Sequence, residues 1–131
     1  MVFNHKMKQS IESMQSTLRK LENSKNQMMQ KGASTTLVSK RLQAIEIGLA
    51  LLEYRWDSKP FQSSREEIMA AREVLDGLMP SLENMYEKSK PGSPQRTLLE
   101  RRIRAIELSI EVMKVILNDS TIDKFIDNTE E

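Results

Sequence analysis

Apolar side chains recur along this chain in alternating steps of three and four residues. These steps keep side chains on one slowly drifting face of an α-helix, as in helices that pack against one another. The apolar positions are Met7, Ile11, Met14, Leu18, Leu21 and Met28; Val38, Leu42, Ile45, Leu49, Leu52 and Trp56; Ile68, Leu75, Met79, Leu82 and Tyr86; and Leu99, Ile103, Ile106, Ile110, Met113 and Leu117. We therefore expect four helices, over about residues 7–28, 38–56, 68–86 and 99–117.

The first half of the chain recurs in the second half. Residues 7–57 resemble residues 68–118 without a gap, at an offset of 61 residues that carries Leu21 onto Leu82. A repeat of this length is one supersecondary unit used twice, and short connections make successive helices antiparallel. The sequence predicts an all-α fold: an antiparallel four-helix bundle built from two repeated αα-hairpins with pseudo-twofold symmetry.

Capping signals support these helix ends. Ser64 followed by Glu67 is a capping box, and Ser93 followed by Pro94 is an N-cap with proline at the first helical position. A chain of 131 residues is long enough for one domain with its own core. We expect a single domain over residues 1–131, with repeat unit one at about 4–59, repeat unit two at about 62–119 and an acidic tail at 120–131.

Gly77 and Pro80 fall inside the third predicted helix. Proline removes a backbone hydrogen bond there and clashes with the preceding turn. The equivalent positions in the first repeat, Ser16 and Arg19, carry no such break. The pair indicates a kink or a short interruption of the helix. The alternative is a hinge that moves when a ligand binds.

The second and fourth predicted helices carry a second apolar row beside the first. A bundle can bury such a row, because each helix faces two neighbours and the centre. Alternatively, part of the row is exposed and is buried in a protein partner or in a second copy of the chain, as a homodimer. The candidate interface residues in this second interpretation are Leu37, Ile47, Leu51, Tyr54, Trp56, Leu98, Leu108, Val112 and Val115.

Residues that carry chemistry are scarce. The chain has no cysteine and one histidine, His5. This composition excludes disulfides, zinc–thiolate and haem sites, di-metal bundles that need Glu-x-x-His pairs, and histidine-based triads. No stretch approaches the roughly 18 apolar residues of a membrane span. Glu46 and Glu107 are repeat-related and are the remaining candidates for a carboxylate pair, although pairing with nearby cations is the simpler interpretation. We expect neither a cofactor nor a metal.

Basic residues cluster near the starts of the second and fourth predicted helices. They are Lys40, Arg41, Arg101, Arg102 and Arg104. A helix of this kind can contact the phosphates of a nucleic acid or another polyanion. The interleaved Glu100 and Glu107, the scarcity of aromatic residues and the net charge of +1 favour solvated flanks or ion pairs instead.

These features favour a small, cytoplasmic, non-catalytic interaction or regulatory protein that acts through an apolar helix face. A module that binds nucleic acid or another polyanion is the alternative, and an enzyme using Glu46 and Glu107 is a third hypothesis. The segment before the first loop is basic, whereas the third predicted helix is acidic. We expect a specific surface where the two repeats differ in this way, or where the second apolar rows remain uncovered.

Overall fold

The structure, a computed structural model, describes residues 2–118, with side chains from His5 onward. These residues form four helices: α1 (Val2–Gln30), α2 (Thr36–Asp57), α3 (Arg65–Lys88) and α4 (Pro94–Asn118). The predicted all-α, four-helix fold is therefore confirmed. The predicted acidic tail at 120–131 lies outside the described residues.

The predicted starts of α3 and α4 are confirmed in detail. The Ser64 hydroxyl accepts a hydrogen bond from the Glu67 amide at 3.1 Å, while the Glu67 carboxylate accepts one from the Ser64 amide at 2.9 Å. This reciprocal pair satisfies two amides that the first turn of α3 leaves without helical partners. At α4, the Arg96 amide donates to the Ser93 hydroxyl at 3.2 Å, and Pro94 is the first helical residue.

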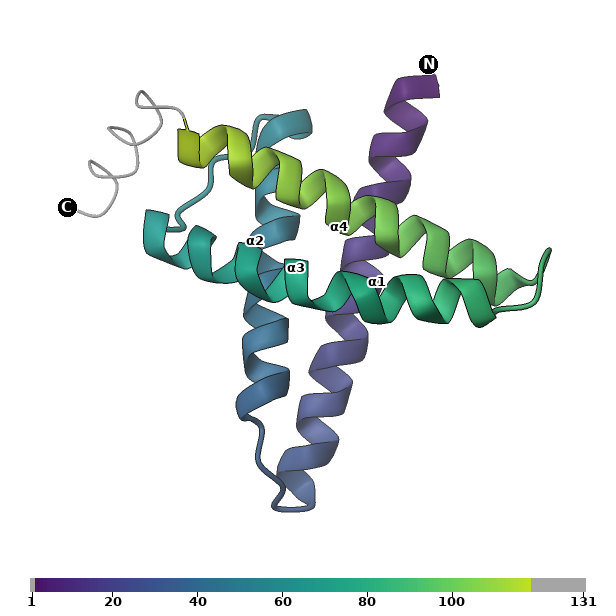
Figure 1. The fold of residues 1–131 in the computed structure, drawn as a ribbon. Helices are drawn as coiled ribbons and strands as arrows, with labels where there is room; N and C mark the ends of the chain where they lie inside the picture. The colour runs from purple at the N-terminus through teal and green to yellow at the C-terminus, as the bar shows by residue number, and fades with distance from the viewer. Residues whose placement is uncertain (1, 119–131) are drawn as a thin grey trace.

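The four helices form two pairs that cross. Figure 1 shows the chain turning back between α1 and α2 and again between α3 and α4, and the first pair lies across the second. Both α2 and α4 pack against all three other helices, whereas α1 and α3 hardly meet. The centre of the bundle is therefore the contact between α2 and α4. Pseudo-twofold symmetry stays a prediction.

Residues at the 61-residue offset have similar burial. Met14 and Leu75 are fully buried, and so are Ile45 and Ile106. The central position of α2 and α4 explains why these two helices carry wider apolar faces than α1 and α3: each has three neighbours to pack against. Much of the second apolar row is thus part of the protein's own core.

Helix α3 continues through Pro80 without interruption. The prediction of a short break is wrong, while the kink and the hinge stay predictions. Gly77 and Pro80 are both exposed, and so is Asp76, whose carbonyl lies one turn before the proline nitrogen. Solvent can satisfy that carbonyl, which lowers the cost of proline at this site.

Two arginines at helix starts hold the ends of neighbouring helices. The Arg65 guanidinium donates to the Leu117 carbonyl at 2.8 Å, at the end of α4. The Arg96 guanidinium donates to the Ser89 carbonyl at 3.0 Å, just after α3, and lies 4.1 Å from the centre of the Tyr86 ring. Each arginine thus places positive charge at the C-terminal end of the partner helix, where the helix dipole favours it.

Candidate functional site

A long open groove runs between the C-terminal half of α3 and the facing side of α4. Its volume is about 590 Å³. It is lined by Glu83, Tyr86, Glu87, Glu100, Ile103, Arg104, Glu107, Leu108 and Glu111. We call it the acidic groove, because five of these nine residues are glutamates.

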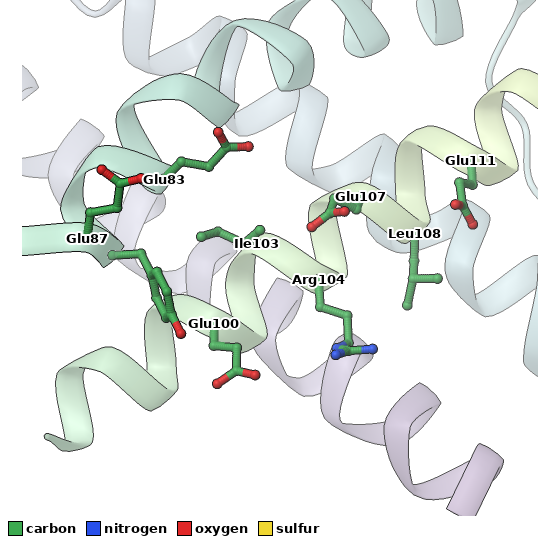
Figure 2. A pocket seen from close by; sticks show the side chains of 9 residues that line it. Glu83, Glu87, Glu100, Ile103, Arg104, Glu107, Leu108 and Glu111 are labelled. Carbon is green, nitrogen blue, oxygen red and sulfur yellow. The ribbon is translucent and has the colours of Figure 1, made fainter. Parts of the chain in front are cut away.

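Helical spacing aligns the glutamates along the groove. Glu83 and Glu87 are four residues apart on α3, and Glu107 and Glu111 are four residues apart on α4, so each pair lies on one helix face. Figure 2 shows Glu83 and Glu87 across from Glu107, with Ile103 between them. Apolar side chains therefore lie between two rows of carboxylates.

The carboxylates of the acidic groove lack cationic partners. None of its five glutamates forms a salt bridge with another residue in the described range. Arg104 is the one cation among the lining residues, and it forms no salt bridge with the groove glutamates within the described residues. Like charges four residues apart destabilise a helix by roughly 0.2–0.5 kcal/mol per pair. With five glutamates and one arginine among its lining residues, the groove carries a net negative charge.

The negative charge belongs to the second repeat. The positions equivalent to Glu83 and Glu107 also hold glutamates, Glu22 and Glu46. The positions equivalent to the other three groove glutamates hold neutral residues: Asn26, Ser39 and Ala50. The acidic groove is therefore one of the places where the two repeats differ.

The structure distributes the predicted interface residues among three environments. Ile47, Leu51 and Val112 are buried in the core, and Ile47 also lines the groove between α2 and α3. The contact between α2 and α4 covers this part of both rows. Tyr54 and Trp56 are half-buried against the core.

Four predicted interface residues remain accessible. Leu37, Leu98 and Val115 are exposed at 60%, 56% and 67%. Leu108 is half-buried and lines the acidic groove. Leu37 and Leu98 are repeat-related, and both lie near the N-terminal ends of their helices, α2 and α4. Leu108 lines the acidic groove, and its repeat equivalent, Ile47, lines the groove between α2 and α3.

The predicted polyanion-binding residues do not line one common surface. Lys40 lines a groove between α2 and α3 together with Glu67 and Glu73. Arg101 and Arg104 line a different groove, between α1 and α4. The basic starts of the two helices thus face different neighbours.

Of the remaining two predicted polyanion contacts, Arg41 is half-buried on α2. Arg102 is also half-buried, and its Nε atom is buried without a hydrogen-bond partner. Burial lowers the pKa of the Arg102 guanidinium from its usual value. This position costs stability, because a charged group is partly desolvated without full compensation.

Replacing Arg102 by methionine is expected to stabilise the protein. Methionine keeps the aliphatic bulk and removes the unpaired nitrogen, so the free energy of unfolding should rise by about 0.5–1 kcal/mol. Urea denaturation followed by circular dichroism measures this change. Arg101→Met is the matched control on an exposed neighbour, with an expected change within about 0.5 kcal/mol. A clear loss of stability in Arg102→Met would show that the guanidinium makes a net favourable contact.

The candidate carboxylate pair is not assembled in a common groove. Glu107 lines the acidic groove, whereas Glu46 is exposed on α2 and is not among its lining residues. Within residues 2–118, no cluster of three or more histidine, aspartate or glutamate side chains has a geometry that could hold a metal ion. The same part of the chain contains no helix apolar and long enough to cross a membrane.

Sequence reasoning did not find the acidic groove, although a signal was present. Glu83, Glu87, Glu107 and Glu111 fall at helical spacing beside the seam positions Leu82, Tyr86, Ile106 and Ile110. The sequence does not show that these two helix flanks face each other across the acidic groove.

No family model, no curated protein and no solved structure matches this chain.

Proposed function

We propose that this protein is a non-catalytic interaction module, and that the acidic groove binds a basic, amphipathic helix of a partner protein. The observation that carries the proposal is the combination of apolar side chains and unpaired glutamates in one concave surface. Tyr86, Ile103 and Leu108 supply the apolar contacts, and the flanking glutamates supply the charge. A helix laid into a hydrophobic groove is a common mode of peptide recognition.

The spacing of the glutamates supports a helical ligand. Lysine or arginine residues four positions apart on a bound helix have the same repeat as Glu83 with Glu87 and Glu107 with Glu111. Opposite charges across an interface accelerate encounter and reject partners of the wrong sign. Binding a cationic helix also relieves the repulsion within each glutamate pair. An acidic or neutral peptide would leave that repulsion in place.

The test is binding of a designed peptide. A fluorescein-labelled helix of leucine, lysine and alanine, with a leucine stripe flanked by lysines four residues apart, is titrated with the protein and followed by fluorescence anisotropy. We expect Glu83→Gln combined with Glu87→Gln to weaken binding about tenfold or more, equivalent to about 1.4 kcal/mol. Raising the salt concentration should weaken binding to the unaltered protein as well.

The chain offers a matched control. Glu22→Gln combined with Glu46→Gln removes the same charge from exposed positions of the first repeat and should leave the affinity unchanged. A peptide of the same composition with scrambled lysine positions should bind the unaltered protein weakly. Equal affinity for both peptides, or equal losses in the two double variants, would contradict recognition by the acidic groove.

A further inference from the structure

A second groove lies on the other side of α4, between it and the N-terminal half of α1. Its volume is about 280 Å³. We call it the basic groove; it is lined by Lys6, Gln9, Ser10, Thr97, Glu100, Arg101 and Arg104. Three cations face one carboxylate, and the remaining three residues carry neutral polar groups. The basic groove therefore combines positive charge with several hydrogen-bond donors.

Ser10 is the least expected residue in this groove. It is 1% exposed, although serine is mostly found at the surface. Its side chain forms no hydrogen bond with another described residue, yet it lines the groove. By contrast, the other buried serine, Ser109, donates its hydroxyl proton to the Ala105 carbonyl at 2.9 Å. In the described residues, Arg102 Nε is the buried side-chain atom without a partner, so the Ser10 hydroxyl reaches the groove, where a ligand would supply an acceptor.

The repeat supplies a counterpart with different chemistry. The groove between α2 and α3 has almost the same volume, about 270 Å³, and shares positions with the basic groove at the 61-residue offset. There Glu67 replaces Lys6, Ala70 replaces Gln9, and Ala71 replaces Ser10. Lys40, equivalent to Arg101, is its one cation among the lining residues and faces two carboxylates, those of Glu67 and Glu73. The two grooves thus use equivalent positions of the two repeats, but the basic groove has three cations and the groove between α2 and α3 has one.

We propose that the basic groove binds the phosphoryl group of a small phosphorylated molecule. Arginine guanidinium groups match phosphate oxygens with paired N–H donors, and lysine adds a compact positive charge. Arg101, Arg104 and Lys6 provide these contacts, and the Ser10 hydroxyl donates to a further oxygen. Glu100 leaves two net positive charges in the groove, which balance a phosphoryl dianion. This site shares Glu100 and Arg104 with the acidic groove, but it does not include Glu83 and Glu87, the glutamates altered in the peptide test.

Isothermal titration calorimetry with inorganic pyrophosphate tests the proposal. The unaltered protein should release heat on binding, and Arg101→Gln should weaken the affinity about tenfold or more. Ser10→Ala, which installs the residue found at position 71, should weaken it several-fold without loss of helix content by circular dichroism. Lys40→Gln is the matched control: it removes the same charge from the equivalent position and should leave the affinity unchanged.

A single-stranded DNA oligonucleotide distinguishes a small phosphorylated ligand from a nucleic acid. We expect its binding to be weak and to be displaced by pyrophosphate. The proposal is overturned if pyrophosphate produces no binding heat, or if Lys40→Gln weakens pyrophosphate binding as much as Arg101→Gln does. It is also overturned if the oligonucleotide binds tightly and resists displacement, since the cations would then form an extended nucleic-acid surface.

Discussion

Replacing Ile106 by alanine should lower the free energy of unfolding by about 3 kcal/mol. Ile106 is 1% exposed and belongs to the core. It lies on α4, which packs against all three other helices, so neighbouring side chains have little room to close the cavity. Truncating a buried isoleucine to alanine typically costs about 2–5 kcal/mol, from lost transfer free energy and the residual cavity. Urea denaturation followed by circular dichroism measures the loss.

The same helix provides the control for this prediction. Leu98→Ala removes a similar volume from a side chain that is exposed at 56% and should change stability by no more than about 0.5 kcal/mol. Similar losses at the two positions would mean that Leu98 is buried in solution, as in an oligomer. Size-exclusion chromatography with light scattering would identify that case.

Replacing Gly48 by valine should lower the free energy of unfolding by about 2–3 kcal/mol, as expected for overpacking. A Cβ atom at this position would lie 2.8 Å from the Met14 methyl group and 3.2 Å from the Ser109 hydroxyl oxygen. Ser109 is fully buried and hydrogen-bonded to the Ala105 carbonyl, whereas the Met14 methyl is the end of a flexible, fully buried side chain that would have to shift. The close approach of α1, α2 and α4 at this point depends on the missing side chain.

Gly77 is the opposite case on α3. A Cβ atom there would meet nothing within 4 Å. Gly77→Ala should therefore raise the free energy of unfolding by about 0.5–1 kcal/mol, because alanine restricts the unfolded chain and favours the helix. Thermal and urea denaturation measure both glycine variants. We expect the free energy of unfolding to fall in Gly48→Val and to rise in Gly77→Ala. A fall in Gly77→Ala would indicate that α3 needs flexibility at this position.

Local features of the fold were predictable from the sequence because they depend on near neighbours. The capping box at Ser64 and Glu67 spans three residues, and Pro94 marks its own helix start. The seam positions were predictable as well, because the 3–4 spacing identifies the buried face of each helix whatever its partners are. Met14, Ile45 and other seam residues are accordingly found in the core.

Features that depend on how the helix pairs meet were not predictable. The crossing of the pairs brings α2 against α4, and this contact decides that Leu51 is buried while Leu37 is exposed. Both grooves beside α4 also arise from that arrangement. Glu100 and Arg104 line both of them, so one short stretch of sequence contributes to two surfaces of opposite charge. No periodicity in the chain contains that information.

The contact between Gly48 and Ser109 makes the side chains allowed at these two positions depend on each other. The two residues lie close together where α2 meets α4. A larger side chain at position 48 therefore needs a smaller one at position 109, so we expect the effects of substitutions at the two positions to be non-additive.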